Sequence, residues 1–291
     1  MTSNPKGAVI VNAYWQGGDE GAKEIAASLR ALGVHVDFLR ASEVDLAVGE
    51  GLSGRFPYDF AVFLDKDDHL ARLLEKSGVR LFNSAESIRL ADDKMLTHIA
   101  LCPLPQPETI SSPLFFAGED DVTVVDKVQS RLGYPIVVKK CFGAFGKGVY
   151  LAKNREELLA LRLRLLGEPH LYQKYVECGA SDFRVITVGG KAVAAMKRKA
   201  TKQGEFRANA ALGGSGEAVE LTEEMRFLAE EASKRLGLEY AGVDLLWDGS
   251  KYLIAEVNSN AHFALIRKVT GVDVAKEYAK YMLSEIKGEQ A

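Results

Sequence analysis

The sequence predicts a mixed α/β (α+β) protein made of three units. Apolar strand-like runs alternate with amphipathic helical runs up to residue 82, a pattern typical of a parallel sheet covered by helices. Prolines at positions 103, 105 and 107 then stop a helical stretch, because proline has no amide donor. Two hairpin patterns in the remaining chain predict an antiparallel sheet. We therefore place the units at residues 1–83, 84–176 and 177–291.

The first unit is predicted to be a small Rossmann-like domain. Strands are expected at residues 8–13, 34–39, 60–64 and 79–82, with helices between them. The first helix carries an apolar stripe, which comprises Ala22, Ile25, Ala26, Leu29 and Leu32. No G-x-G-x-x-G sequence follows the first strand, so this unit shows no dinucleotide site of its own.

The second and third units are predicted to combine strands with capped helices. A helical segment at residues 84–101 leads into the central unit. That unit is expected to contain strands at residues 135–141, 149–152 and 171–176 and helices near residues 122–132 and 156–166. The third unit is expected to contain hairpins at residues 183–196 and 241–258. Thr222 should begin a helix that Gly237 ends.

The composition excludes several classes of protein. A net charge of -3 and an isoelectric point near 6.0 argue against nucleic acid or an acidic membrane as a partner. The three cysteines are widely spaced, which indicates neither a disulfide framework nor a zinc site. No apolar run reaches the roughly 18 residues of a membrane span, and the N-terminus has no signal-peptide pattern. We expect a soluble, cytoplasmic protein.

The second hairpin carries three side chains with oxygen ligands. We expect residues 248–250 to form its loop. Asp244 then lies opposite Ile254 and diagonal to Glu256, and Asn258 shares the face of Glu256. Two carboxylates about 7 Å apart repel by about 2 kcal/mol at an effective dielectric constant near 20, and Mg²⁺ or Mn²⁺ would remove that repulsion. The alternative is a solvated acidic face without a ligand.

The opposite face of this hairpin is apolar and should pack into the core. It is expected to carry Val243, Leu245, Trp247, Leu253, Ala255 and Val257.

Glycines and basic side chains in the second and third units suit an anionic ligand. The stretch Gly143-Ala144-Phe145-Gly146-Lys147-Gly148 can fold over a phosphate, but it lacks the P-loop spacing and can equally be a mobile connection. Lys139, inside an apolar run, should need an anionic partner unless it points outward from an edge strand. Three arginines lie in or beside the strands of the third unit, and these are Arg184, Arg198 and Arg207. Arginine suits phosphate and carboxylate oxygens, although surface ion pairs are the commoner use.

His262, after the acidic hairpin, could contact a substrate or be structural.

Taken together, these motifs resemble the RimK-type ATP-grasp ligases, a family of glutamate and other carboxylate-amine ligases. The resemblance runs in order from Ser84 to the C-terminus. It is carried by Lys94, the strand of Lys139, the glycine stretch, Gln173-Lys174-Tyr175-Val176, Asp182-Phe183-Arg184, Lys197-Arg198, Phe206-Arg207-Ala208-Asn209, Gly242-Val243-Asp244, Glu256-Val257-Asn258 and Thr270-Gly271-Val272-Asp273. It implies an ATP-grasp fold with an N-terminal Rossmann-like domain, a small central lid domain and a C-terminal antiparallel-sheet domain.

The resemblance also implies roles for individual residues around ATP. Lys94 and Lys139 would hold its phosphates, and Asp182 would bind the ribose hydroxyls. Further cofactor-binding residues would be Gly143, Gly146 and Gly148 over the phosphates, Gln173, Lys174, Tyr175 and Val176 along the adenine, and Arg207, Ala208 and Asn209 at the transferring phosphate. Arg184, Arg198 and Arg207 would be catalytic, and Asp244, Glu256 and Asn258 would bind Mg²⁺ or Mn²⁺.

The implied activity is an ATP-dependent amide or peptide ligation that proceeds through an acyl phosphate. The partners would be ATP, a carboxylate and an amine on an amino acid, a peptide or a protein tail, with glutamate among the candidates. A homo-oligomer is expected. Two alternatives remain, a non-catalytic ATP-binding protein and a kinase of the same fold. The segment Ser259-Asn260-Ala261-His262-Phe263 replaces the family's usual Ala-Ser-Pro-Gly, which gives the neighbouring pocket a different shape.

Overall fold

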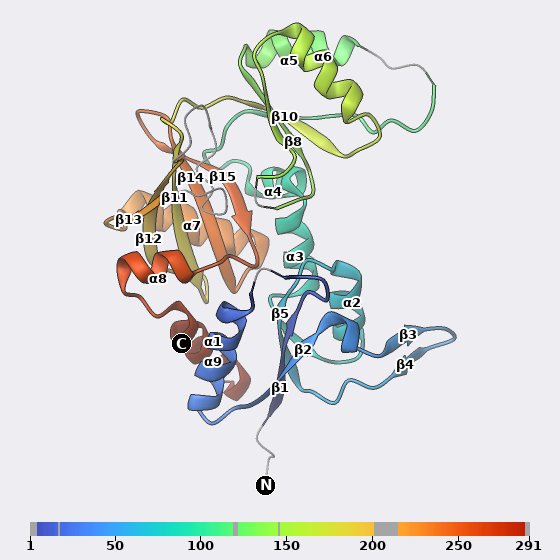
Figure 1. The fold of residues 1–291 in the computed structure, drawn as a ribbon, viewed down its shortest axis with the longest axis vertical. Helices are drawn as coiled ribbons and strands as arrows, with labels where there is room; N and C mark the ends of the chain where they lie inside the picture. The colour runs from blue at the N-terminus through green and yellow to red at the C-terminus, as the bar shows by residue number, and fades with distance from the viewer. Residues whose placement is uncertain (1–4, 17, 119–121, 145, 201–214, 289–291) are drawn as a thin grey trace.

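Three main β-sheets and the helices that cover them make up the protein (Figure 1). The structure is a computed structural model, and it describes residues 5–16, 18–118, 122–144, 146–200 and 215–288. Within these ranges no helix is long and apolar enough to cross a membrane.

The N-terminal sheet is parallel throughout, as the sequence predicts. Its strands run in the order β2-β1-β5-β6. They are β1 (Lys6–Val11), β2 (His35–Arg40), β5 (Phe60–Leu64) and β6 (Arg80–Phe82), and the helices of this region are α1 (Glu20–Ala31) and α2 (Asp68–Lys76). Leu32 does not belong to the buried stripe of α1, because the helix ends at Ala31 and leaves Leu32 37% exposed. The small hairpin of β3 (Leu46–Val48) and β4 (Leu52–Gly54), which projects from this region in Figure 1, was not predicted.

The helical segment after this sheet is broken into two helices. These are α3 (Ala85–Asp92) and α4 (Lys94–Leu101). Asp93 between them has an extended backbone, and its carboxylate accepts hydrogen bonds from the amides of Met95 and Leu96. The side chain therefore caps α4, as aspartate favours at a helix start. This break makes Lys94 the first residue of α4.

The central sheet has one face covered by two helices of its own unit, whereas its other face meets α4. Its order is β7-β10-β8-β9, with strands β7 (Thr109–Ser111), β8 (Ile136–Lys140), β9 (Val149–Ala152) and β10 (His170–Lys174). Helices α5 (Thr123–Leu132) and α6 (Arg155–Arg164) pack on the face that bears Ile136, Val138 and Tyr172. Because side chains alternate along a strand, Lys139 and Gln173 belong to the opposite face. We call this second face the inner face.

The C-terminal sheet is antiparallel, as predicted, in the order β13-β12-β11-β14-β15. The strands are β11 (Ser181–Val188), β12 (Lys191–Lys199), β13 (Ser215–Ala218), β14 (Tyr240–Trp247) and β15 (Tyr252–Asn258), and the helices are α7 (Glu223–Leu236), α8 (Ala264–Thr270) and α9 (Val274–Lys287). The cap predictions for α7 are confirmed: Thr222 Oγ1 accepts from the amide of Met225, and Gly237 is left-handed with φ 66°. The predicted stripe of α7 is buried on one face of this sheet.

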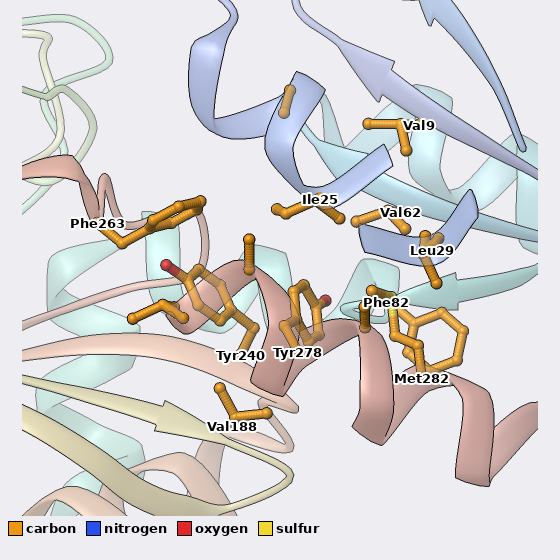
Figure 2. Packing of buried hydrophobic residues seen from close by; sticks show 14 of the residues in the cluster. Val9, Ile25, Leu29, Val62, Phe82, Val188, Tyr240, Phe263, Tyr278 and Met282 are labelled. Atoms are coloured by element: carbon orange, nitrogen blue, oxygen red, sulfur yellow. The ribbon is translucent and has the colours of Figure 1, made fainter. Parts of the chain in front are cut away.

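A shared hydrophobic core joins the two ends of the chain. Ile25 and Leu29 of α1 face Tyr278 and Met282 of α9, and Tyr278 stacks on Tyr240 of β14 with ring centroids 4.8 Å apart (Figure 2). The N-terminal sheet is thereby held against the C-terminal sheet by apolar burial. The central sheet lies above the C-terminal sheet in Figure 1, with α4 beside β15.

The predicted register of the second hairpin is wrong by one residue next to the loop and by two residues at Asp244. Trp247 pairs with Tyr252, so the loop is 248–251 rather than 248–250. Pairing then shifts at a β-bulge, and Asp244 faces Glu256 directly instead of diagonally. The alternation of side chains did not indicate that the loop is longer by one residue, nor that β15 contains one extra residue at the bulge.

The same bulge corrects the predicted apolar face. Val243, Leu245 and Val257 pack into the core as predicted. Ile254 joins them in place of Leu253 and Ala255, because the bulge reverses the alternation of β15 before residue 256. Trp247, at the end of the hairpin, is 38% exposed rather than core.

Candidate nucleotide and metal site

Four alternating charges lie side by side on one face of the C-terminal sheet. Arg184 is the cross-strand partner of Asp244, and Asp182 is the cross-strand partner of Arg198. Arg184 donates from Nε and Nη2 to the two carboxylate oxygens of Asp244, both at 2.6 Å. Arg198 donates to both oxygens of Asp182 at 2.6 Å and lies 3.0 Å from Oδ1 of Asp244. We call these four residues the charged array.

The charged array is buried, so its charges depend on one another. Arg198 and Asp244 are 4% and 6% exposed, which contradicts both the surface ion pair for Arg198 and the solvated strand face for Asp244. Burial acts to raise the pKa of Asp244, but the guanidinium groups of Arg184 and Arg198 outweigh it and lower that pKa. Burial raises the pKa of Asp182, and the guanidinium of Arg198 opposes that shift. Removing one member would leave a buried charge without its partner.

The predicted metal ligands share this face of the sheet. Glu256 lies directly opposite Asp244, and Asn258 lies opposite Gly242, one alternate position further along. Facing side chains start from Cβ atoms about 5 Å apart, closer than the diagonal spacing predicted from the sequence. Carboxylate and amide oxygens suit Mg²⁺ or Mn²⁺, so the donor set fits a hard divalent cation. Asp244 would share its oxygens with the two arginines.

Protein ligands alone would not fill the coordination shell of such a cation. Within the described ranges, no three residues of the types His, Cys, Asp and Glu come together as a metal cluster. Two carboxylates and one amide leave positions for waters and phosphate oxygens, which is how Mg²⁺ is commonly held beside a nucleotide.

Two lysines approach the acidic pair from the central sheet and α4. Lys94, which is 8% exposed, places Nζ 3.7 Å from Glu256 and donates to the carbonyl of Gly143 at 3.1 Å. Lys139 lies on β8 with strands on both sides, so it is not the edge-strand lysine of the alternative interpretation. Burial lowers the pKa of Lys139 to about 8, with Glu256 opposing and Lys94 reinforcing the shift. Helix α4 and the central sheet thus bring both predicted phosphate-binding lysines towards Glu256.

The glycine stretch connects β8 to β9 and has the backbone that glycine permits. Gly143, Gly146 and Gly148 have φ angles of 135°, 71° and 82°. A Cβ on Gly148 would lie 3.0 Å from Cγ of Lys140, so a side chain there would have to displace the Lys140 side chain. The burial of Cys141 raises its pKa to about 11, which makes a packing role fit better than a reactive thiol.

Other predicted nucleotide-binding residues fall at the end of β10 or outside the described ranges. Gln173 is buried within β10, whereas Lys174 is exposed and ends that strand. Tyr175 and Val176 follow it and are half-buried. Arg207, Ala208 and Asn209 lie outside the described residues.

Sequence reasoning missed a polar group next to Gln173. His98 of α4 and Thr109 of β7 both lie within hydrogen-bond distance of the Gln173 side-chain amide, and Gln106 contacts the other side of His98. The spacing of Lys94 and His98, four residues apart on one helix, places both on the same face. That spacing is the signal by which His98 could have been found.

The N-terminal sheet contributes its carboxyl edge to the neighbourhood of the site. Asn260 donates to the backbone carbonyl of Leu64, the last residue of β5, at 2.8 Å. The ring of Trp15, which follows β1, lies 5.8 Å from the ring of His262. Ligands commonly bind at the carboxyl ends of parallel strands. The altered segment 259–263 therefore meets the edge where a second ligand is expected.

Comparison with solved structures defines the fold of the protein. D-cycloserine synthetase DcsG superposes with a TM-score of 0.75 at 18% identity, covering 97% of this chain and 99% of that one. D-alanine–D-alanine ligase from Bacillus anthracis gives a TM-score of 0.73 at 18% identity, covering 98% of this chain and 100% of that one. At these identities the likeness shows the fold alone, which is the ATP-grasp fold predicted from the sequence.

Sequence comparison then identifies the family. The model of the RimK-like ATP-grasp domain matches residues 91–282, and the chain belongs to this family, as its motifs predict. Over 231 residues it is 35% identical to human N-acetylaspartylglutamate synthase A, covering 78% of this chain and 58% of that protein. Over 222 residues it is 36% identical to a probable alpha-L-glutamate ligase of Mannheimia succiniciproducens, covering 74% and 71%. The chain thus spans less than two thirds of the length of the first of these relatives.

Proposed function

We propose that this protein is an ATP-dependent carboxylate-amine ligase that forms an amide bond through an acyl phosphate. The observation that carries the proposal is the approach of Lys94 and Lys139 to the acidic pair of Asp244 and Glu256, in a chain of the RimK-like ATP-grasp family. Two cations beside two carboxylates suit a phosphate chain that is bound together with a divalent metal.

ATP is proposed to lie between the inner face of the central sheet and the charged face of the C-terminal sheet. Lys94 and Lys139 bind its phosphates, the segment from Gln173 to Val176 lines the adenine, and Asp182 faces the ribose hydroxyls. Asp244, Glu256 and Asn258 would hold Mg²⁺ or Mn²⁺, which would supply positive charge to the phosphate oxygens. Arg207 and Asn209 are proposed to contact the transferring phosphate.

The reaction consists of two displacements that the protein promotes by position and charge. An oxygen of the substrate carboxylate attacks the γ-phosphorus, and the bond to the ADP oxygen breaks. The amine nitrogen then attacks the acyl carbon, phosphate leaves, and the nitrogen loses a proton. The chain needs no nucleophilic side chain for these steps, because orientation and electrostatic stabilisation supply the acceleration in phosphoryl transfer.

The acid and amine are proposed to bind where the N-terminal sheet meets segment 259–263. Trp15, Asn260 and His262 lie at this edge. Glutamate is the first amine to test, because the names of two relatives contain it. The different sequence of segment 259–263 leaves other amino acids and peptides as candidates.

The test is a phosphate-release screen with Mg²⁺-ATP and pairs of acids and amines, followed by mass spectrometry of the product. We expect phosphate only when both substrates are present, and a product lighter by one water than their sum. Asp244→Asn and Glu256→Gln should abolish release, whereas Glu217→Gln on the exposed edge strand β13 should not. Unchanged activity in Asp244→Asn would refute the metal assignment.

Two other outcomes would point to the alternative functions. Nucleotide binding without turnover across the whole panel would indicate a non-catalytic ATP-binding protein. A product that retains the phosphate on an alcohol would indicate a kinase.

A further inference from the structure

A chain of hydrogen bonds, buried between His98 and Gln173 and part-buried elsewhere, links α4 to the inner face of the central sheet. His98 Nδ1 lies 2.7 Å from Oε1 of Gln106, and Nε2 of Gln106 donates to the backbone carbonyl of His98 at 2.9 Å. Nε2 of Gln173 lies 3.0 Å from His98 Nε2 and donates to Thr109 Oγ1 at 2.9 Å. Thr109 Oγ1 in turn donates to the carbonyl of Pro107 at 2.8 Å.

The direction of every hydrogen bond in this chain follows from two backbone carbonyls. A carbonyl only accepts, so Gln106 must point its NH₂ group at the carbonyl of His98 and its oxygen at His98 Nδ1. His98 Nδ1 therefore carries the proton, and Nε2 is left as an acceptor. The group that Gln173 presents to Nε2 must then be its NH₂.

The backbone carbonyl of Pro107 fixes the same orientation of the Gln173 amide independently. Thr109 uses its hydroxyl proton on the carbonyl of Pro107, so its oxygen can only accept from Gln173. Both N–H groups of the Gln173 side chain are therefore used, one towards His98 Nε2 and one towards Thr109 Oγ1. Its oxygen must point away from His98 and Thr109.

The side-chain oxygen of Gln173 lies at the end of this chain of hydrogen bonds. Gln173 is 2% exposed, and among the described residues nothing donates a hydrogen bond to its Oε1. Gln173 lies on the inner face that also carries Lys139. This oxygen is not among the fully buried polar atoms that lack a partner, so it keeps some access to solvent while the rest of the side chain is buried. A ligand with an N–H group can therefore reach it and donate to it.

We infer that His98 is a positioning residue that holds the Gln173 amide with its oxygen towards the nucleotide base. The site then accepts the 6-amino group of adenine and disfavours a base with an oxygen at that carbon. This inference rests on the proposed ATP site.

The surroundings of His98 keep its ring in the state that this role needs. Burial and the ammonium group of Lys139 lower the pKa of His98 to about 4, with Lys94 adding to the shift and Gln106 and Glu256 opposing it. The ring is neutral at pH 7. A protonated ring would point N–H groups at both glutamines and would favour the reversed orientation of the Gln173 amide.

The test compares ADP with IDP, which carries oxygen in place of the 6-amino group. Dissociation constants of both Mg²⁺ complexes are measured by calorimetry on the full chain. Wild type should prefer ADP, and His98→Leu should reduce that preference by roughly tenfold or more, because the amide is no longer held. Gln173→Leu should do the same. Adding His98→Leu to Gln173→Leu should change the preference no further, since both act through one group.

Two more variants keep the test decisive if His98→Leu folds poorly. Gln106→Leu acts on the same chain one step further away and should reduce the preference less. His98→Gln can accept from Gln173 through its own oxygen and should restore part of the preference. Ile99→Leu, exposed on the same helix, is the matched control and should leave both affinities unchanged.

The outcomes separate this inference from the proposed function. Equal weakening of ADP and IDP in His98→Leu, with the preference intact, would overturn the positioning role while leaving the ligase proposal standing. Wild type that binds neither nucleotide would overturn both. A loss of preference that His98→Leu also causes in the Gln173→Leu background would show that His98 acts by another route.

Discussion

Glu256→Gln should weaken ligand binding and leave the stability of the fold nearly unchanged. The reason is that the attraction and the repulsion acting on this carboxylate nearly cancel. Nζ of Lys94 lies 3.7 Å from Glu256, which gives an attraction of about 4 kcal/mol at an effective dielectric constant near 20. Asp244 lies directly opposite Glu256, where Cβ atoms are about 5 Å apart, and two carboxylates at that spacing repel by about 3 kcal/mol on the same basis. We expect the free energy of unfolding to change by only about 1 kcal/mol.

Metal and nucleotide binding should respond much more strongly to the same change. The amide removes one of two carboxylates from the proposed cation site, and even indirect partners of a metal contribute roughly tenfold to a hundredfold to affinity. We therefore expect Mg²⁺-ADP to bind at least about a hundredfold more weakly. Calorimetry gives the affinity, and urea unfolding gives the stability.

The matched control is Glu217→Gln, the same chemical change on an exposed position of the same sheet. This variant should alter neither the affinity for Mg²⁺-ADP nor the free energy of unfolding. Wild-type affinity in Glu256→Gln would refute the placement of the metal. Destabilisation by several kcal/mol would refute the cancellation of charges.

Three further predictions concern the charged groups and one close backbone approach. Nucleotide affinity should fall as pH rises through about 8, where Lys139 loses its proton; titrating ADP binding from pH 6.5 to 9.5 tests this, and Lys139→Arg should remove the dependence. Arg198→Leu should destabilise the fold by about 3–5 kcal/mol in urea unfolding, because Asp182 is left buried without its partner; a loss below about 1 kcal/mol would contradict this. Gly242→Ala would bring its Cβ within 2.4 Å of Ala261 Cβ, so we expect the segment after β15 to shift and thermal unfolding to begin several degrees earlier, whereas an unchanged midpoint would contradict the clash.

Local patterns were sufficient to predict many elements of this fold. The helix from Thr222 to Gly237 was predicted with its caps and its buried stripe, because each signal lies within a few neighbouring residues. The parallel N-terminal sheet followed from the alternation of strands and helices. The edge strand β13 and the short helix α8 were not predicted, since four and seven residues carry little periodicity.

The register of the acidic hairpin could not be predicted from local patterns. Asp244 and Glu256 were assigned to one site from their types and spacing. Their direct opposition depends on a four-residue loop and a bulge, each of which shifts the pairing by one residue in the same direction, and neither was predicted from the sequence. The structure therefore brings the two carboxylates closer than the sequence predicted.

The sequence by itself determined the family, the fold and the residue types of the candidate site, since motifs of charged, glycine and amide residues are local. Only the tertiary structure decided their partners. Arg184 and Arg198, predicted as catalytic residues, are bound to Asp244 and Asp182 across neighbouring strands. His98 reaches Gln173 across 75 positions of the chain. Such contacts arise from the pairing of strands and the packing of α4, which depend on the whole chain and not on neighbouring residues.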